Sequence, residues 1–412
     1  MVTIDAERFR ETFEQYAAIG RTDADGLHRL ALSSADETVR DRFVSDLEAL
    51  GLAVRVDGIG NVFGRAAGTD PDAAPVLIGS HLDSQPYGGR FDGQLGVLTA
   101  LETLRAFDDA GIEHRRPVEI VNWTNEEGSR FKPALMGSGA FTGELDADEV
   151  LGHTDADGVT VADALEAIGY RGDAPIGPRE PYHSFLELHI EQGPKLEEAD
   201  RSVGIVEGVF GMAWLEVTVR GDADHAGPSP VHSRKDALVA ASDVVRAVRR
   251  LSNRLADDVV PTVGAFEAAP GAIHGIPHER RFTSAERGYP DTAAYELVER
   301  VEREVRTACE REDVEYDLEE IWRIPHTEFS PMVAETALSA AADVGAAHQP
   351  MVSGAGHDAT YLNEVTEAAM VFVPSVDGKT HNEAEYTEWA DAVEGARVYA
   401  ETTERLANRG GE

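Results

Sequence analysis

The sequence predicts an α/β protein of two domains, in which a larger domain with a mixed sheet flanked by helices is interrupted by a smaller α+β domain. Two observations lead to this prediction. Strand-like and helix-like segments alternate in the first half of the chain and resume near its end, as in α/β sheets. Between these parts, residues 212–323 follow the order strand, helix, strand, strand, helix, strand, which is the split βαβ or ferredoxin-like plan.

The first half of the chain begins with helical periodicity and then changes to strands. Apolar residues recur at three- and four-residue intervals between residues 5 and 50, which predicts helix. The later patterns predict strands at 52–57, 61–66, 75–81 and 117–128, with a helix at 96–107. The predicted strands at 75–81 and 117–128 both end in polar residues. Because functional groups gather beyond the carboxyl ends of strands in α/β sheets, both strand ends indicate a possible site.

The smaller domain is predicted to be an insertion. Its strands are expected at 212–221, 259–268, 280–288 and 314–323, and its helices at 234–251 and 292–312. Patterns like those of the first half return at 334–345 and 368–375. We therefore assign 1–211 and 324–412 to the larger domain and 212–323 to the inserted one. Its amphipathic helices either cover the small sheet or also pair subunits, and the sequence leaves both open.

The composition is strongly acidic, with 76 Asp and Glu against 37 Lys and Arg and a formal charge of −39. Nucleic acid is a poor partner for such a chain, because phosphate binding needs clustered Lys and Arg. No apolar run approaches the ~18 residues of a membrane span, and the acidic amino end does not resemble a secretory signal. A single cysteine, Cys309, excludes an intrachain disulfide and a multi-cysteine metal site. We expect a cytoplasmic protein without a membrane partner.

The basic residues carry a second signal, because only four of them are lysines. Excess acid with so few lysines suggests a surface that stays soluble in concentrated salt, where repulsion between carboxylates is screened. Ordinary acidity combined with an arginine-favouring codon bias would give the same composition. Neither alternative bears on the fold.

Five short segments hold histidine and acidic residues near predicted strand ends or tight turns: GSHLDSQ (His81, Asp83), GRFDGQLG (Asp92), NEEGSRF (Glu126, Glu127), LELHIEQGP (His189, Glu191) and DGKTHNEAEYT (His381). Imidazole with carboxylate is a normal ligand set for zinc or a similar divalent ion, and a carboxylate can bridge two ions. Each segment alone is weak evidence, since a lone histidine is more often structural. Neighbours such as Glu126 and Glu127 point to opposite sides of an extended chain, so one could bind metal while the other faces the activated water.

Together these motifs resemble the dinuclear-zinc amidohydrolases of the M20 peptidase superfamily. They are most similar to the branch of N-carbamoyl-L-amino-acid hydrolases, allantoate amidohydrolases and β-ureidopropionases, and the resemblance spans nearly the whole chain. It implies a zinc-peptidase-like catalytic domain over 1–211 and 324–412. It also implies that the inserted ferredoxin-like domain serves as a dimerisation (lid) domain.

The resemblance also implies roles for individual residues. Asp92 matches the carboxylate that bridges two divalent ions, with zinc expected first and manganese, cobalt or nickel also possible. The remaining ligands fall into two pairs, His81 with His189 and Glu127 with His381. Glu126 matches the general base, and Asp83 matches the carboxylate that orients His81.

Further matches concern the substrate and the partner subunit. His225 corresponds to a histidine that reaches the active site of the partner in a homodimer and stabilises the developing oxyanion. Arg287 corresponds to the arginine that binds the substrate carboxylate, although a surface salt bridge would be the ordinary role of an arginine here. Gln192 and His357 match polar substrate-facing positions. His274, like Gly271, stands where the family usually has Asn, so the identity of the substrate is open.

The resemblance therefore predicts hydrolysis of a linear C–N amide bond in a small anionic substrate, an N-carbamoyl-L-amino acid or a ureido acid such as allantoate. One alternative is an aminoacylase or dipeptidase of the same superfamily. Another is a non-catalytic acidic binding protein on the same scaffold, which would be expected to lack the base or a ligand.

Overall fold

The computed structural model describes residues 1–252, 259–269 and 271–410, which form two compact units. The first unit comprises Met1–Glu207 and Phe329–Glu412, and the second comprises Gly208–Glu328. The segment predicted as an insertion, 212–323, lies inside the second unit, which extends a few residues further at both ends.

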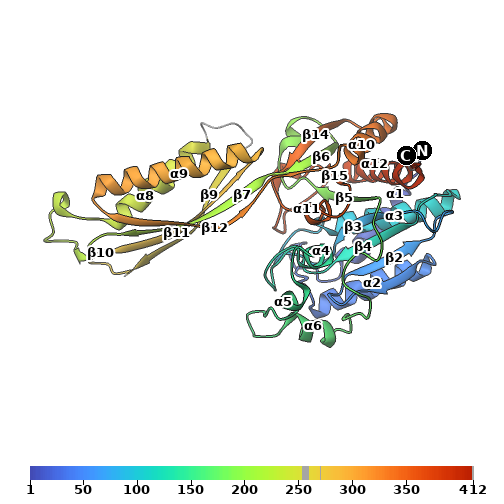
Figure 1. Cartoon of the computed structure of the whole chain (residues 1–412), viewed down its shortest axis with the longest axis horizontal. Coiled ribbons are helices and arrows are strands. Elements are labelled where there is room, and N and C mark those ends of the chain that lie inside the picture. Colours follow the sequence, from blue (N-terminus) through green and yellow to red (C-terminus); the bar gives the residue numbers. More distant parts are fainter. Residues whose placement is uncertain (253–258, 270, 411–412) are drawn as a thin grey trace. The chain divides into compact units, whose positions relative to one another are not determined.

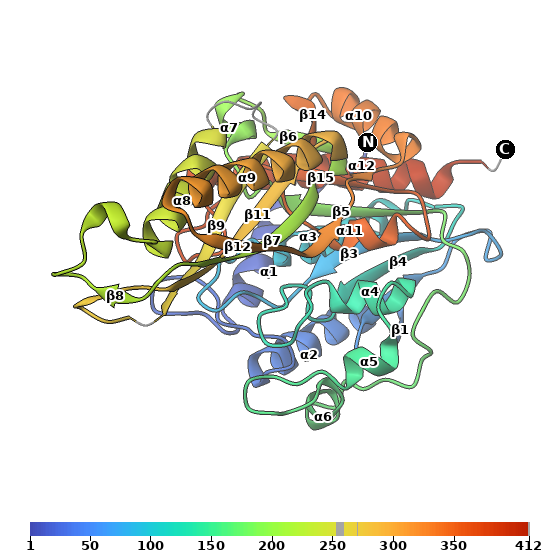
Figure 2. The same cartoon turned by 60° about the vertical axis from the view of Figure 1, so that its left-hand side comes forward.

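The larger sheet has nine strands within the described residues. Its order is β1 (Ala53–Val56), β2 (Val62–Ala66), β4 (Val118–Trp123), β3 (Val76–His81), β5 (Ser184–Ile190), β15 (Ala368–Val373), β6 (Val203–Val209) and β13 (Thr327–Glu328), and β14 (His348–Ser353) also pairs with β6. The neighbours β4, β3, β5 and β15 are parallel, and the pairings outside them are antiparallel where a direction is described. Figures 1 and 2 show these four strands side by side. The sheet is therefore mixed, as predicted.

The four parallel strands are buried at every position. Burial on both faces explains their nearly continuous apolar sequences. Their carboxyl ends are in register, because His81 pairs with Trp123 and Ile190 pairs with Val373. Residues that follow these strands are consequently brought to one edge of the sheet.

Helices flank this sheet (Figure 1). The longer ones are α1 (Ala6–Ala17), α2 (Ser34–Ala49), α3 (Gln94–Ala110), α10 (Pro331–Val344) and α12 (Trp389–Asn408). The shorter ones are α4 (Met136–Thr142), α5 (Ala147–Leu151), α6 (Val161–Ala167), α7 (Lys195–Glu198) and α11 (Asp358–Leu362). Both α3 and α12 pack on β3 and β5. No helix among the described residues is long and apolar enough to cross a membrane.

The prediction of helix from residue 5 to residue 50 is wrong for residues 18–33. These residues form turns and an isolated bridge between Arg21 and Leu27, and two separate helices flank them. The local sequence explains the break: Gly20 adopts a φ of 82°, and Ser33 accepts a hydrogen bond from the N–H of Asp36 as the cap of α2. Apolar periodicity alone does not reveal this interruption.

The second unit contains a four-stranded antiparallel sheet in the order β12 (Glu315–Ile324), β7 (Gly211–Arg220), β11 (Glu279–Gly288) and β9 (Val259–Ala269). The helices α8 (Ala237–Ser252) and α9 (Asp291–Glu312) pack on it and on each other. Chain order and strand order together are those of the predicted split βαβ plan. Buried side chains from the sheet and both helices, including Leu215, Val244, Phe282 and Val301, form the core of this unit.

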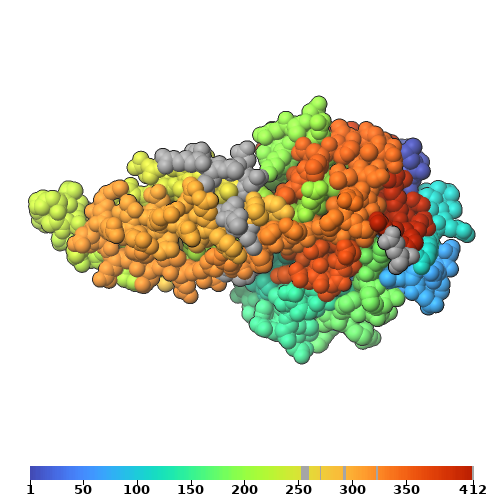
Figure 3. Space-filling model, turned by 45° about the horizontal axis from the view of Figure 1, so that its top comes forward, coloured from blue at the N-terminus to red at the C-terminus, as the bar shows by residue number. Residues whose placement is uncertain are grey.

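Helices α8 and α9 thus cover the small sheet, which is one of the two roles predicted for them from the sequence. On the face drawn in Figure 3, residues of α9 and β12, in orange, form much of the surface of this unit. A smaller ribbon pairs β8 (Asp224–His225) with β10 (Gly275–Ile276).

Candidate active site

The candidate site is built from residues at the carboxyl ends of the four parallel strands. His81 is the last residue of β3, and His189 is the last but one of β5. Glu126 and Glu127 follow β4. The same edge of the sheet therefore collects side chains from distant parts of the chain, as expected for an α/β sheet.

The first ligand group consists of His81, Asp92 and His189, all buried. Oδ1 of Asp92 lies 3.1 Å from Nε2 of His189 and 3.5 Å from Nε2 of His81. The three ligand atoms all lie within 4.8 Å of one another, so one ion can be held by all of them.

The second ligand group consists of Asp92, Glu127 and His381, and its ligand atoms also lie within 4.8 Å of one another. Nε2 of His381 is 3.4 Å from Oδ2 of Asp92 and 3.6 Å from Oε2 of Glu127. The two oxygens of Asp92 thus face different groups. His381 has a side chain that is 46% exposed, so this group is more open than the first.

The hydrogen bonds of the two buried histidines place the ring proton on Nδ1, so that Nε2 carries the lone pair that a metal ion needs. Nδ1 of His81 lies 3.0 Å from the carbonyl oxygen of Asp83, and Nδ1 of His189 lies 2.9 Å from that of Ile190. Both carbonyls require the proton to be on Nδ1. Nε2 of His189 then accepts the N–H of Gly93, whereas Nε2 of His81 is buried without a hydrogen-bond partner among the described residues. An orphaned imidazole nitrogen beside a carboxylate fits a metal ligand.

Asp83 holds the turn that carries the two glutamates. Its Oδ1 accepts the N–H of Glu126 at 3.2 Å, and its Oδ2 accepts the N–H of Glu127 at 3.3 Å. The Asp83 carboxylate is 3.7 Å from Nδ1 of His81, which is hydrogen-bonded to the Asp83 carbonyl instead. That the Asp83 carboxylate orients the His81 ring stays a prediction from the resemblance.

The turn after β4 separates the directions of the two glutamates. Asn125 adopts a φ of 53°, and its amide donates to the carbonyl oxygens of Phe131 and Pro133. Oε2 of Glu126 lies 3.5 Å from Nε2 of His81, in the first group, whereas Glu127 faces the second.

Gly93 is needed for the close approach of His81. It adopts a φ of 62°, and a Cβ at this position would overlap the imidazole ring of His81. Any other residue here would meet both backbone strain and this overlap, which explains the glycine after the central aspartate.

The site concentrates negative charge in a buried place. Burial, together with the charges of Asp358, Glu127 and Asp92, raises the pKa of Glu126 well above its ordinary value, although His81 opposes the shift. Burial and the Asp92 charge likewise raise the pKa of Glu127. Burial disfavours protonation of His81, but the carboxylates around it outweigh that effect and its pKa is raised. Divalent cations would relieve this repulsion, so the donor set fits a metal centre.

Gln192 and His357, two predicted substrate-facing residues, lie beside these groups. Nε2 of Gln192 donates to Oδ2 of Asp92 at 2.8 Å, and its Oε1 is buried without a hydrogen-bond partner among the described residues. The ring of His357 stands edge-on to that of His189, with centroids 4.7 Å apart. Burial, and then the His189 ring, lower the pKa of His357 well below its ordinary value.

The other three predicted residues lie in the second unit. His225 and His274 are neighbours through the β8–β10 ribbon, with parallel rings whose centroids are 6.5 Å apart. Nδ1 of His225 accepts the N–H of Gly227 at 3.0 Å, so the neutral ring carries its proton on Nε2. Arg287 lies on β11, paired in register with Met212 and Val260, and burial lowers its pKa.

Two residues at the site, the partly buried Gln85 and the buried Glu385, were not predicted from the sequence. Gln85 donates its backbone N–H to Oε1 of Glu127 at 3.0 Å and its amide to Oε2 at 2.7 Å. Glu385 accepts two backbone N–H groups beside Asp92, and burial with the Asp92 charge raises its pKa to about 8. In a chain with 76 acidic residues, no pattern distinguishes such a glutamate.

Glu191, which belongs to one of the five segments, has a structural contact instead. Its carboxylate caps α7 by accepting the N–H groups of residues 195 and 196.

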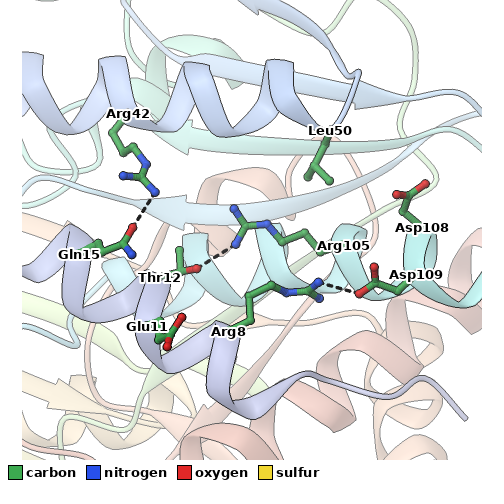
Figure 4. A pocket seen from close by; sticks show the side chains of 9 residues that line it. All are labelled: Arg8, Glu11, Thr12, Gln15, Arg42, Leu50, Arg105, Asp108 and Asp109. Atoms are coloured by element: carbon green, nitrogen blue, oxygen red, sulfur yellow. Dashed lines mark hydrogen bonds and ion pairs between the residues drawn. The ribbon is translucent and has the colours of Figure 1, made fainter.

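A separate cleft of about 380 Å³, lined by residues of α1, α2 and α3 and by Leu50, contains none of the predicted site residues (Figure 4). Its arginines are already engaged. Arg8 donates to Asp109 at 2.7 Å, Arg42 to Gln15 at 2.7 Å, and Arg105 to Thr12 at 2.9 Å. With acidic side chains also in its walls, this cleft offers no surplus positive charge for an anion.

Comparison with known proteins identifies the class. The model of peptidase family M20/M25/M40 matches residues 77–405, and the chain belongs to this family. An N-carbamoyl-L-amino-acid amidohydrolase of Rhizobium meliloti is 39% identical over 392 residues, 94% of each chain. The allantoate amidohydrolase of Escherichia coli K12 is 33% identical over 414 residues, 99% of each chain.

A solved structure agrees with these relatives. The crystal structure of an amidase of the hydantoinase/carbamoylase family from Burkholderia multivorans is 41% identical, with a TM-score of 0.94 over 99% of each chain. The comparisons confirm the prediction of an amidohydrolase of the M20 family.

Proposed function

We propose that this protein uses two divalent metal ions to hydrolyse the linear C–N amide bond of an N-carbamoyl-L-amino acid, or of a ureido acid such as allantoate. The observation that carries the proposal is the position of Asp92 between two ligand groups, with one carboxylate oxygen facing each. The activities named for the relatives from Rhizobium meliloti and Escherichia coli support this substrate class.

His81, Asp92 and His189 would hold one ion, and Asp92, Glu127 and His381 the other. Histidine with carboxylate suits zinc first, and manganese, cobalt or nickel can use the same donors. When bound, such ions lower the pKa of a water molecule to about 7 and polarise the scissile carbonyl group. The chain itself supplies the ligands, and in the first group it also fixes the tautomers of both histidines and buries them.

Glu126 is the proposed general base. It is buried, and its carboxylate reaches the first ligand group, where a water molecule held by the ions would lie within its reach. We propose that Glu126 takes the proton of the attacking water and delivers it to the nitrogen that leaves. For an N-carbamoyl substrate the products would be the free amino acid, ammonia and carbon dioxide.

His225 is proposed to stabilise the oxyanion that develops on the scissile carbonyl. The hydrogen bond from Gly227 leaves its Nε2–H available as a donor, which is the form this role needs. By family resemblance His225 acts in the partner subunit's site, so the proposed active form is a homodimer in which the second unit serves as the dimerisation (lid) domain.

Arg287 is proposed to bind the carboxylate of the substrate. Burial reduces the hydration of its guanidinium group, which would favour a bidentate ion pair. Gln192, His274 and His357 would complete the polar contacts to the substrate. His274 gives a contact of different shape from the usual Asn, so it is a candidate for setting substrate preference.

The test is a panel of substrates assayed with the metal-loaded protein: N-carbamoyl-α-amino acids, N-carbamoyl-β-alanine, allantoate and N-acetyl amino acids. We expect hydrolysis of a carbamoyl or ureido substrate and much slower hydrolysis of the N-acetyl compounds. Preference for N-acetyl amino acids or dipeptides would instead assign the aminoacylase or dipeptidase alternative.

A further inference from the structure

Glu385 is a buried carboxylate that the proposed chemistry does not use. It is 4% exposed and lies four residues after His381. Its Oε1 accepts the backbone N–H of Phe91 at 3.0 Å and that of Asp92 at 3.1 Å. The carboxylate therefore fixes the backbone from which the Asp92 side chain projects.

The second oxygen of Glu385 reaches the loop that carries His381. Oε2 lies 3.2 Å from Oγ1 of Thr380, the residue before His381. The same hydroxyl is 3.2 Å from Oδ2 of Asp92, so its single proton can serve either carboxylate. One buried side chain thus links the segments that supply two of the three members of the second ligand group.

The chain around Asp92 is shaped to fit this carboxylate. A Cβ at Gly89 would overlap the carboxyl group of Glu385. A side chain at residue 89 would therefore displace the Glu385 carboxyl group from its present position, and the glycine there leaves room for it. The contact is therefore an integral part of the loop and not an incidental surface contact.

We propose that Glu385 is a positioning residue that holds Asp92 and the Thr380–His381 segment in the arrangement needed by the second ligand group. It acts through hydrogen bonds to the backbone and to Thr380, not on the substrate. The second group needs such support more than the first, because His381 is half exposed and lies on a loop. Loss of a group that orients metal ligands typically weakens metal binding by about 10–100-fold.

This inference rests on the proposed two-metal function. The test distinguishes a failure of the proposed role of Glu385 from a failure of the two-metal function itself. Metal-free protein is titrated with Co²⁺, and binding is followed by the visible absorption of the bound ion. The wild-type protein should bind two ions per chain. Glu385→Ala should bind the more weakly held ion roughly 10–100-fold less tightly, whereas Glu385→Gln, which keeps an acceptor oxygen for the two N–H groups, should recover the larger part of that loss.

The matched control is Glu102→Ala. Glu102 is a buried carboxylate that also joins two segments, through the N–H of Asp5 and the guanidinium of Arg8, but it lies in α3 away from the ligands. Its loss should lower the melting temperature and leave Co²⁺ binding unchanged. If Glu385→Ala does not fold, Thr380→Val tests the same link.

The outcomes are distinct. A wild-type protein that binds no Co²⁺ contradicts the proposed function. The role of Glu385 is overturned if the wild-type protein binds two ions and a folded Glu385→Ala variant gives the same Co²⁺ binding isotherm. It is also overturned if a Glu385→Gln variant binds as weakly as the alanine variant, because hydrogen-bond positioning would not then explain the loss.

Discussion

The carboxylate of Asp83 accepts the backbone N–H of Glu126 at 3.2 Å through Oδ1. Its other oxygen accepts the N–H of the next residue, Glu127, so both glutamates of the turn depend on one side chain. The proposed base and a proposed metal ligand are therefore oriented together. An alteration at Asp83 should affect both functions at once.

We predict that Asp83→Ala loses both proposed activities, turnover and tight binding of the second metal ion. Two buried N–H groups would be left without an acceptor, so the free energy of unfolding should also fall by about 1–3 kcal/mol. Kinetic assays, metal analysis and urea unfolding measure the three effects. The control is Asp23→Ala, because Asp23 lies on an exposed turn. Normal turnover in Asp83→Ala would show that the turn of Glu126 and Glu127 holds its shape without the Asp83 carboxylate.

Glu126→Gln should separate chemistry from metal binding. The amide is almost the same size but cannot accept the proton, so kcat should fall by roughly 10²–10⁴-fold. Glu126 belongs to neither ligand group, so the metal content of the variant should equal that of the wild-type protein. An unchanged kcat would remove Glu126 as the base.

Arg287→Ala should act on substrate binding. A buried, charge-assisted hydrogen bond contributes about 1.5–3 kcal/mol, so KM for a carboxylate substrate should rise by roughly tenfold or more, with a smaller change in kcat. Arg281→Ala is the control on the same strand, because Arg281 is exposed and faces Glu216 at 3.5 Å. Equal KM values in the Arg287 variant and the control would dismiss the proposed role and favour an ordinary surface arginine.

His183 predicts a pH dependence of stability that is independent of the metal groups. Burial, and then the charges of Arg116 and Arg409, lower its pKa from 6.5 to about 4, and its Nε2 lacks a hydrogen-bond partner among the described residues. Between pH 6.5 and about 4 the unfolded chain binds more protons than the folded one, so the folded state loses stability as the pH falls through this window.

His183→Gln should remove that part of the slope. Because the side chain is partly exposed, solvent screening reduces the expected effect to about 1–2 kcal/mol at pH 4. Urea unfolding of variant and wild type across this pH range measures it, with the exposed His232→Gln as control. Parallel stability curves for His183→Gln and the wild type would contradict the prediction.

The strand ends of the large sheet were predictable from the sequence, because buried parallel strands are short apolar runs and polar residues mark where they stop. The segments holding His81 and the two glutamates were found in this way. The break after α1 was not predicted, since Gly20 and the cap at Ser33 interrupt a periodicity that continues on both sides.

Contacts between segments distant in the chain could not be predicted. The two-residue ribbon that places His274 beside His225 is too short to show a strand pattern. The role of the Asp83 carboxylate depends on where two N–H groups point, and Glu385 contacts a loop almost 300 residues away. In so acidic a chain, residue type alone cannot distinguish these carboxylates from those at the surface.

Metal removal and return, measured with an N-carbamoyl-L-amino acid or allantoate as substrate, tests the proposed two-metal hydrolysis. We predict that chelation abolishes hydrolysis and that activity returns with Zn²⁺ in proportion to occupancy, reaching its maximum at about two ions per chain. Full activity in protein shown by elemental analysis to contain no metal would rule out a metal-dependent hydrolysis.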